Sequence, residues 1–396
     1  EMKTQLIKHS FIIFSVILMC LFSFSFQFSQ PIENVNATSF SSLANSSSSA
    51  KGMCVIEKDS GRILYSKNKD QKLPMASTTK VATAITVIEN CDDLDESIVV
   101  NDSAIEVKGT SIYLRKDEEI KVIDLLYGLM LRSGNDAATA LAYHIGGGID
   151  EFAKMMNETA KKAGASNTNF VNPHGLDDPN HYTTAYDLSK ITAYALNNPI
   201  FEKIVSTKNY IIEATNKSEK RYLTNKNKLL RSLDGCCGVK TGYTSKAGRC
   251  LVSASKRDDC TIVCVVLNCG PMFEESSALI NSAFNEFELK KIIDRNQEIY
   301  NEYILSDKEG KLYLYTDEDF YYPLRADEFD DIKIKYSVEL KDAKSLDEVG
   351  KIDIFFKNDL IKSLKLYTMN KIDKLINNKT LQIEEILWEE NINENQ

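Results

Sequence analysis

The chain has no excess of basic residues, and this absence excludes one large class of partners. Its 48 lysines and arginines are outnumbered by 57 aspartates and glutamates, which gives a formal net charge of -9 at pH 7. A protein that binds nucleic acid needs a basic face to neutralise the phosphates. We therefore expect no nucleic-acid partner.

The chain also lacks Cys-x-x-Cys spacing, although it contains nine cysteines. This absence argues against a zinc site, and we expect neither a metal nor a cofactor. Five of the cysteines lie in or beside apolar, strand-like segments, where cysteine behaves as a small hydrophobic residue. Free buried thiols are therefore the favoured prediction. A disulfide to a neighbouring strand, or a redox role, for Cys236 and Cys237 is the alternative.

Beyond its N-terminus the sequence has no apolar run of the length that crosses a membrane. At the N-terminus, two lysines precede an apolar run over residues 11–28, and Val-Asn-Ala at residues 35–37 offers a small-residue cleavage site. This pattern predicts a secretory signal over residues 1–37, followed by a Ser-rich tether over residues 38–52. The mature protein is then expected in the cell wall or at the outer face of the cytoplasmic membrane. An uncleaved anchor is the alternative, and association with the membrane surface stays open.

The length of 396 residues suggests two domains, and the residue patterns divide the chain into two regions. Residues 53–288 mix strand and helix patterns, with a helical stretch that is interrupted at residues 132–136. The expected strands are residues 53–57, 62–65, 238–243, 249–254 and 261–267, and the expected helices are residues 81–88, 123–142, 187–196 and 276–287.

Residues 289–382 alternate apolar and polar positions and predict a small all-β domain without a catalytic motif. We expect it to act as a spacer or docking module. The tail, residues 383–396, is mostly acidic and carries a helical apolar stripe that includes the only tryptophan, Trp388. A membrane-surface helix normally has a basic polar face, so a packed or frayed end is favoured over an anchor.

Three short motifs stand in one order along the mixed region: Ser77-Thr78-Thr79-Lys80, Ser133-Gly134-Asn135 and Lys240-Thr241-Gly242. A Ser-x-x-Lys motif alone is common, and it also starts at Ser48, Ser66 and Ser253. The three motifs together supply a serine nucleophile with a nearby lysine, a second serine with an amide, and a cationic strand. This is the residue set of penicillin-recognising acyl transfer.

The first motif predicts an activated nucleophile. Residues three apart on a helix share a face, so the Ser77 hydroxyl and the Lys80 amine can meet. A lysine acts as a general base only when it is neutral, which requires burial or a nearby positive charge, and Lys240 is the expected source of that charge. Ser77 follows Pro74 and lies near a helix N-terminus, where developing negative charge is favoured.

The other two motifs predict contacts with the substrate. Ser133 could relay a proton to the leaving group, and the Asn135 amide could hold a substrate amide. Lys240 and the Thr241 hydroxyl could bind a carboxylate, while Gly242 on the same strand leaves room for a substrate backbone. The backbone amides of Ser77 and Tyr243 are the expected oxyanion hole.

Further motifs extend the pattern: Leu73-Pro74-Met75-Ala76, Asn172-Pro173-His174-Gly175-Leu176, His181-Tyr182-Thr183-Thr184-Ala185 and Lys246-Ala247-Gly248. On all these residues the chain resembles the serine D-Ala-D-Ala carboxypeptidases among the low-molecular-mass penicillin-binding proteins, over nearly the whole mature chain. The resemblance implies an α+β fold, in which a β-lactamase/transpeptidase-like domain, an antiparallel sheet flanked by helices, precedes a small all-β domain. It also implies removal of the terminal D-alanine from peptidoglycan stem pentapeptides through an acyl-enzyme, with β-lactam antibiotics as inhibitors.

The resemblance assigns a role to each matched position. Ser77 corresponds to the acylated nucleophile, Lys80 to its proton acceptor and Ser133 to the second catalytic serine. Asn135 corresponds to a substrate-amide contact, and Lys240 with Thr241 to the carboxylate site. Some relatives carry an arginine shortly after the strand that ends at Leu267. Residues 270–274 offer none here, and Lys226 is a substitute.

Three other interpretations are weighed against this one. A Ser-His arrangement using His174 or His181 is disfavoured, because the resemblance places both in a loop that shapes the fold and Lys80 already supplies a base. A class A β-lactamase would need a deacylating glutamate, and no Glu-x-x-Leu-Asn pattern lies between Ser133 and Lys240. A non-catalytic penicillin sensor or wall-binding scaffold is the third alternative.

Overall fold

The structure is a computed structural model that describes residues 48–295, 299–305, 308–339, 347–368 and 380–387. The predicted signal segment and most of the predicted tether lie outside these residues. Within the described part of the chain, no helix combines the length and the apolar character needed to span a bilayer.

The catalytic region is built on a five-stranded antiparallel sheet with the strand order β2-β1-β9-β8-β7. The strands are β1 (Gly52–Glu57), β2 (Ile63–Lys67), β7 (Cys236–Thr244), β8 (Gly248–Arg257) and β9 (Cys260–Leu267). β9 is almost entirely apolar and lies in the centre, as expected of a strand that is buried on both faces. β7 lies at one edge of this sheet, and it carries the third motif.

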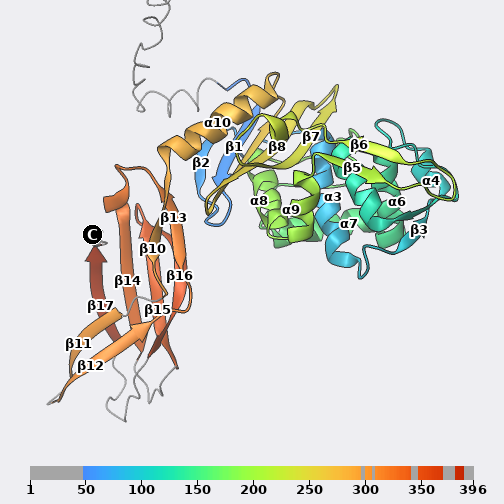
Figure 1. Ribbon diagram of the computed structural model, residues 1–396. Coiled ribbons are helices and arrows are strands. Elements are labelled where there is room, and N and C mark those ends of the chain that lie inside the picture. The colour runs from blue at the N-terminus through green and yellow to red at the C-terminus, as the bar shows by residue number, and fades with distance from the viewer. Residues whose placement is uncertain (1–47, 296–298, 306–307, 340–346, 369–379, 388–396) are drawn as a thin grey trace, which may run out of the picture. The chain divides into compact units, whose positions relative to one another are not determined.

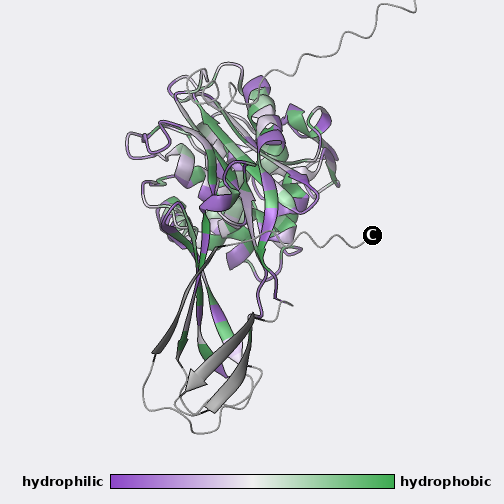
Figure 2. Ribbon diagram, turned by 90° about the vertical axis from the view of Figure 1, so that its left-hand side faces the viewer, coloured by the Kyte–Doolittle hydropathy of each residue, from purple (hydrophilic) through white to green (hydrophobic). Residues whose placement is uncertain are grey.

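Helices cover both faces of this sheet. Alternate residues of β9 point to opposite sides, so Val263 and Val265 enter one core cluster whereas Cys264 and Val266 enter another. The helix α10 (Met272–Glu286) packs on the second face, and α8 (Ala185–Leu196) and α9 (Pro199–Ser206) lie on the first (Figure 1). Figure 2 shows the corresponding hydropathy, with hydrophobic stretches along the strands and hydrophilic residues in the outer loops.

The remaining elements of this region contribute to the same core cluster as α8. They are α3 (Lys80–Asn90), α4 (Asp102–Ile105), α5 (Val122–Tyr127), α6 (Asn135–Gly146) and α7 (Ile149–Lys162), with the small pairs β3 (Ser97–Val99) and β4 (Glu119–Lys121), and β5 (Asn209–Ile212) and β6 (Arg221–Thr224). Local capping starts two of the helices. The Thr184 side chain accepts from the amide of Asp187 at 3.0 Å, and Asn198 caps α9, whose first residue is Pro199.

These elements confirm most of the expected helices and strands of the mixed region. The predicted interruption at residues 132–136 is confirmed, because α5 continues into a π-helical turn, Gly128–Arg132, before α6 begins at Asn135. The helix expected over residues 276–287 begins earlier, at Met272. The helix expected after Pro74 begins as a 3-10 turn, Ala76–Thr79, and becomes α-helical only at Lys80.

The C-terminal region is all-β, as predicted. A six-stranded antiparallel sheet has the order β11-β12-β16-β15-β14-β17, and β10 pairs with β13. The strands are β10 (Glu288–Ile293), β11 (Ile299–Leu305), β12 (Lys308–Tyr315), β13 (Phe320–Leu324), β14 (Ile332–Glu339), β15 (Glu348–Phe356), β16 (Asp359–Thr368) and β17 (Thr380–Leu387). Alternate apolar residues of β14 and β15, such as Ile334, Val338, Ile352 and Ile354, form a separate core.

The helical pattern predicted for the start of the tail is wrong, because residues 380–387 form the strand β17, which pairs with β14. Ile383 lies opposite Tyr336 and Ile386 lies opposite Ile334, so three residues of β17 span two residues of β14. This irregularity is a β-bulge, which absorbs one extra residue. The three-residue spacing between the apolar residues Ile383 and Ile386 therefore comes from a bulge in a strand and not from a helix. Residues 388–396, with Trp388, lie outside the described residues.

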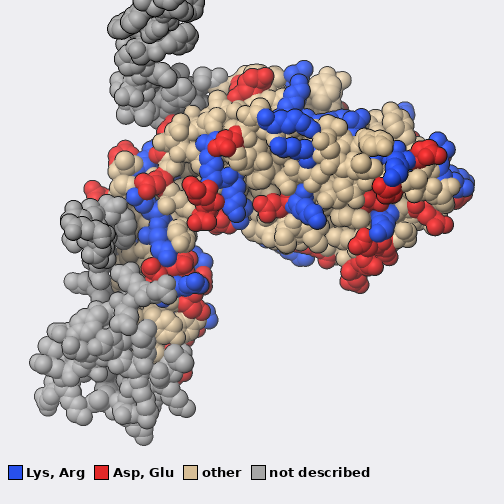
Figure 3. Space-filling model, in the orientation of Figure 1, with Lys and Arg blue, Asp and Glu red and all other residues tan. Residues whose placement is uncertain are grey.

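The cysteines of the described residues are not cross-linked, and acidic and basic side chains share the surface. All eight cysteines from Cys54 to Cys269 are free thiols, as favoured from the sequence, although only four of them are fully buried, and Cys236 and Cys237 form no disulfide. On the face shown in Figure 3, acidic and basic side chains are interspersed. Exposed ion pairs such as Lys154 with Glu151, at 2.6 Å, contribute little to the free energy of unfolding.

Candidate active site

The first motif forms a tight turn that presents a single hydroxyl. Thr78 Oγ1 donates to the Met75 carbonyl at 2.6 Å, and Thr79 Oγ1 donates to the Ala76 carbonyl at 2.8 Å, so both threonines are buried within the turn. Ala76 adopts a left-handed conformation with φ of 51°, which is uncommon for a residue with a side chain. Ser77 is therefore the hydroxyl residue of the motif that faces the pocket described below.

Lys80, the first residue of α3, is completely buried beside this hydroxyl. Its Nζ lies 3.0 Å from Ser77 Oγ, 2.7 Å from Asn135 Oδ1 and 2.7 Å from the His174 carbonyl oxygen. All three partners are neutral oxygens. Burial, and then the positive charges of Lys240 and Lys226, hold the pKa of Lys80 well below its usual value.

Lys240 is the second buried lysine of the site, and only 1% of its surface is exposed. Its Nζ donates to the Thr241 carbonyl at 3.0 Å. Burial, with a smaller contribution from Lys226, lowers the pKa of Lys240 to about 7. The sequence predicts that the charge of Lys240 lowers the pKa of Lys80. The direction agrees, but burial is the larger cause, and it acts on both lysines.

The second motif lies where the helical stretch is interrupted. Ser133 follows the π-helical turn, is buried, and adopts a left-handed conformation with φ of 66° and ψ of 36°. Asn135 then begins α6, and both ends of its side-chain amide are engaged. Oδ1 accepts from Lys80, and Nδ2 donates to the Lys108 carbonyl at 2.7 Å. In this structure the Asn135 amide therefore positions Lys80, and its contact with a substrate amide stays a prediction.

Asp136 is a buried residue of the site that the sequence reasoning missed. Its carboxylate accepts hydrogen bonds from the backbone amides of Ile112 and Leu114 and from Ser111 Oγ, at 2.5–3.1 Å. These bonds fix the loop before β4, which supplies Thr110 to the pocket and the Lys108 carbonyl to Asn135. The only available signal was an acidic residue directly after the second motif, within an apolar helix.

Gly242 lies against the turn that carries the nucleophile. A Cβ atom at this position would lie 3.0 Å from the backbone nitrogens of both Ser77 and Thr78. The missing side chain therefore makes room for the chain's own nucleophile turn against β7, and the predicted approach of a substrate backbone stays a prediction. This close approach brings the third motif next to the first, although 163 residues separate Ser77 from Lys240.

The three motifs meet at one pocket of about 470 Å³, which is large enough for a small peptide end. Its lining residues are Ser77, Thr110, Ser133, Lys226, Lys228, Thr241, Gly242, Tyr243, Arg249, Met272 and Phe273. Of the predicted site residues, Lys80 and Asn135 lie behind Ser77, and Lys240 lies behind Thr241, so these three do not line the pocket itself.

Arg249 is the second residue that the sequence reasoning missed. It pairs with Tyr243 across the β7-β8 hairpin, is exposed, and lines the pocket together with Lys226, which was predicted as a substitute cation. Its Nη1 donates to the Gly270 carbonyl at 3.4 Å. The available signal was its position on the strand that follows the third motif, since antiparallel pairing places Arg249 beside that motif.

Two histidines lie near the site, and their ring nitrogens form hydrogen bonds that hold neighbouring residues of the protein in place. His181 Nε2 lies 2.8 Å from Thr79 Oγ1, and its Nδ1 accepts from the Val171 amide at 3.1 Å. His174 Nδ1 accepts from the Leu176 amide at 3.2 Å. Burial lowers the pKa of His174 to about 3 and that of His181 to about 4, so both rings are neutral.

Comparisons with known proteins agree with the residues and the fold. A family model described as D-alanyl-D-alanine carboxypeptidase matches residues 38–270, and one described as penicillin-binding protein 5, C-terminal domain, matches residues 287–374. The D-alanyl-D-alanine carboxypeptidase DacF of Bacillus subtilis is 34% identical over 277 residues, which cover 68% of this chain and 71% of the relative.

Solved structures are similar over both regions or over the first. Penicillin binding protein 5 from Haemophilus influenzae has a TM-score of 0.69 at 28% identity, over 82% of this chain and 97% of that one. The Streptomyces K15 DD-transpeptidase has a TM-score of 0.57 at 31% identity, over 60% of this chain and 97% of that one.

These matches confirm the resemblance and the fold class that the sequence predicted, an α+β catalytic region followed by an all-β region. The relatives are named as carboxypeptidases, which are hydrolases. This class of enzyme agrees with the three motifs that meet at one pocket. The chain therefore belongs to the D-alanyl-D-alanine carboxypeptidase family of serine peptidases.

Proposed function

We propose that the protein is an exported serine carboxypeptidase that removes the terminal D-alanine from peptidoglycan stem pentapeptides. Ser77 forms an acyl-enzyme with the substrate, and penicillins acylate the same residue. The observation that carries the proposal is the buried Lys80 amine, which lies 3.0 Å from the Ser77 hydroxyl with no carboxylate among its hydrogen-bond partners.

The contacts of Lys80 suit a neutral amine. A neutral amine has two N–H donors and one lone pair. The donors match the two acceptors Asn135 Oδ1 and the His174 carbonyl, each at 2.7 Å, so the lone pair faces the Ser77 hydroxyl. A charged ammonium buried without a counter-ion would be costly, which favours the same protonation state. Lys80 in this form acts as the general base for Ser77.

The reaction then proceeds through two acyl transfers. Ser77 Oγ attacks the carbonyl carbon of the penultimate D-alanine while its proton passes to Lys80, and the backbone amides of Ser77 and Tyr243 stabilise the oxyanion. The C–N bond breaks as the leaving amine takes up the proton held by Lys80, relayed through Ser133, which also lines the pocket. Water hydrolyses the ester, which releases the shortened peptide and restores the Ser77 hydroxyl.

The substrate's terminal carboxylate is expected at the cationic side of the pocket. The Thr241 hydroxyl, Arg249 and Lys226 line this side, and a carboxylate prefers an arginine because the guanidinium can donate two parallel hydrogen bonds. Lys240 supports the site from behind, through the Thr241 carbonyl. Arg249 thus supplies the arginine that residues 270–274 lack.

The peptide itself is expected to run along β7. This strand is at the edge of the five-stranded sheet, so its outer backbone groups can pair with an extended peptide next to Ser77. The predicted signal segment over residues 1–37 supports an extracytoplasmic location, where the stem peptide is found. Association of the mature protein with the membrane surface is part of this proposal.

The test is release of D-alanine from a peptide that ends in D-Ala-D-Ala. We expect the variant Ser77→Ala to lose release and to lose labelling by penicillin, because Ser77 supplies the one hydroxyl among the hydrogen-bond partners of Lys80 Nζ in the described part of the chain. The matched control is Ser66→Ala, which removes the serine of a second Ser-x-x-Lys motif and should leave both activities unchanged. Undiminished release by Ser77→Ala would refute the assignment.

The fate of the penicillin adduct separates the alternatives. Mass spectrometry of the labelled protein should locate the adduct on Ser77 and show that it persists for minutes or longer, as expected of a carboxypeptidase. Rapid turnover of penicillin would instead indicate a β-lactamase. A stable adduct on a protein that never releases D-alanine would indicate a penicillin sensor.

A further inference from the structure

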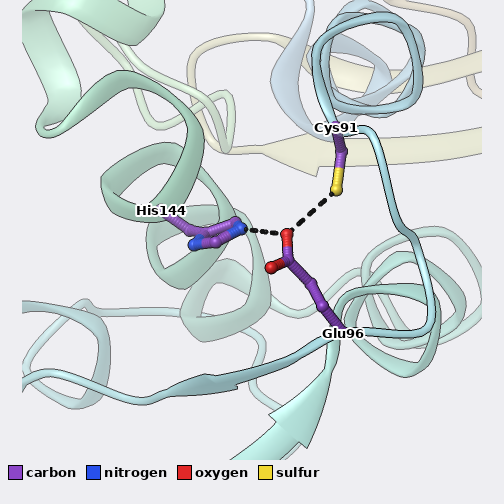
Figure 4. A group of neighbouring side chains, drawn as sticks. All are labelled: Cys91, Glu96 and His144. Atoms are coloured by element: carbon purple, nitrogen blue, oxygen red, sulfur yellow. Dashed lines mark hydrogen bonds and ion pairs between the residues drawn. The ribbon is translucent and has the colours of Figure 1, made fainter.

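Three side chains with metal-binding atoms meet in the catalytic region (Figure 4), and none of them lines the pocket. Cys91 follows the last residue of α3, Glu96 precedes β3, and His144 lies in the last turn of α6. Glu96 Oε1 lies 2.8 Å from His144 Nε2 and 3.4 Å from Cys91 Sγ. One ligand atom from each residue lies within 4.8 Å of the other two, and in the described part of the chain this is the only such group.

We propose that Cys91, Glu96 and His144 form a binding site for a thiophilic divalent cation, with Zn²⁺ as the expected ion. A thiolate, an imidazole and a carboxylate are the three ligand types that zinc uses in proteins, whereas magnesium and calcium prefer oxygen ligands alone. In tetrahedral zinc coordination, neighbouring ligand atoms are about 3.3 to 3.6 Å apart, given the usual bond lengths. The separations of 2.8 and 3.4 Å, and the limit of 4.8 Å on the third, lie on either side of this range, so small rotations of the side chains would admit the ion.

The surroundings of the cluster favour a cation. Four of the six residues from Cys91 to Glu96 are acidic. Lys121 pairs with one of them, Asp95, at 2.9 Å. The exposed side-chain fractions of His144 and Glu96 are 28% and 42%, so an ion can enter from solvent and keep a water molecule as its fourth ligand.

The site is invisible to spacing rules because its ligands come from two separate segments, the loop between α3 and β3 and the last turn of α6. Glu96 is five residues from Cys91, and His144 is 48 residues from Glu96. The absence of Cys-x-x-Cys spacing excludes the common sequence patterns of zinc sites, but it does not exclude a site that folding assembles.

A bound ion would join two helices that also meet at the active site. α3 begins at Lys80 and ends beside Cys91, and α6 begins at Asn135 and carries His144 near its end. At their first residues these helices are joined by the hydrogen bond between Lys80 Nζ and Asn135 Oδ1. On binding, the Cys91 thiol releases its proton to solvent and a Zn–S bond forms, so the ion would fasten the opposite ends of the same two helices.

Calorimetric titration of the metal-free, reduced protein with Zn²⁺ tests the proposal. We expect one ion per chain, and we expect Cys91→Ser and His144→Gln each to weaken binding by at least about tenfold. The matched control is Cys260→Ser, which removes a partly buried thiol outside the cluster and should bind as the unmodified protein does. Mg²⁺ should not compete. No saturable binding, or equal binding by Cys91→Ser and His144→Gln, would overturn the proposal.

Two further measurements distinguish loss of the metal site from misfolding of a variant. Co²⁺ in place of zinc should give a thiolate charge-transfer band that Cys91→Ser loses and Cys260→Ser keeps. Zn²⁺ should also raise the melting temperature of the unmodified protein but not that of His144→Gln. His144 is exposed, so this variant is expected to fold, and circular dichroism checks this. A band that survives in Cys91→Ser would place the ion at another thiol and contradict the assignment.

Discussion

The two regions of this chain differ in one kind of buried charge, a lysine whose hydrogen-bond partners include no carboxylate. In the C-terminal region, the buried carboxylates of the described residues are paired with lysines, as in Asp353 with Lys351 at 2.6 Å and Glu328 with Lys357 at 3.1 Å. In the catalytic region, Lys80 is buried among neutral oxygens. Burial of an ionisable group without a counter-ion costs free energy, so its retention indicates a chemical use.

The first prediction concerns the buried amine of the catalytic region. Replacing Lys80 with methionine keeps a long apolar side chain but removes the base, so the rate of penicillin acylation should fall by roughly 10²- to 10⁴-fold. Stopped-flow or mass-spectrometric acylation kinetics measure this. Lys256→Met is the matched control, because Lys256 ends another Ser-x-x-Lys motif but is exposed. An acylation rate within a few-fold of that of the unmodified protein would show that the buried Lys80 amine has no such chemical use.

The second prediction concerns the apolar core of the C-terminal region. Ile352 is fully buried in this core, and Ile352→Ala should lower the free energy of unfolding of this region by about 2 to 5 kcal/mol. Acylation of Ser77 should stay unchanged, since this core contains no residue of the pocket. Urea denaturation, followed in parallel with acylation, measures both quantities.

The control for this core substitution is Leu360→Ala, in the same sheet. The Leu360 side chain is 55% exposed, so its loss should change the free energy of unfolding by less than about 0.5 kcal/mol. Equal losses for both variants would contradict the core assignment. A loss of acylation in Ile352→Ala would show that the two regions are energetically coupled.

In both regions the sequence predicts strands with a local pattern correctly, and it fails where the structure depends on distant contacts. Alternation along β14 to β16 and the apolar run of β9 depend on near neighbours, and both were predicted correctly. β17 was mistaken for a helix because its three-residue apolar spacing becomes a bulge only when it pairs with β14, which is more than 40 residues away. Pairing of this kind leaves no local pattern.

The candidate site shows the same limit. The three motifs were visible because nucleophile, base and cation stand in short runs, but Asp136 and Arg249 were missed. Asp136 acts through the backbone of residues 111–114, and Arg249 reaches the pocket only through the pairing of β7 with β8. Gly242 was recognised, but the space that it leaves is filled by the turn that carries Ser77.

The third prediction sharpens the contrast between buried and exposed cations within the catalytic region. Arg249 is exposed, so Arg249→Ala should lower kcat/KM by only about tenfold for a peptide with a free terminal carboxylate. It should have little effect on the same peptide with a terminal amide. Lys246→Ala, in the turn between β7 and β8 and outside the pocket lining, is the control. An equal loss for both peptides would exclude a role in carboxylate binding.

The last and smallest effect tests how the two buried lysines interact. The positive charge of Lys240 lowers the pKa of Lys80, so Lys240→Gln should let Lys80 hold its proton to higher pH. Acylation needs a neutral Lys80, so the rate rises with pH as Lys80 loses its proton. The acidic limb of the profile should therefore move to higher pH in this variant, whatever its maximal rate. Lys228→Gln also removes a pocket cation, but Lys228 has no part in the pKa shift of Lys80, so it should leave the limb in place. A limb that stays fixed in Lys240→Gln would mean that burial and Lys226 keep Lys80 neutral without Lys240, and Lys240 would then serve only the carboxylate side of the pocket.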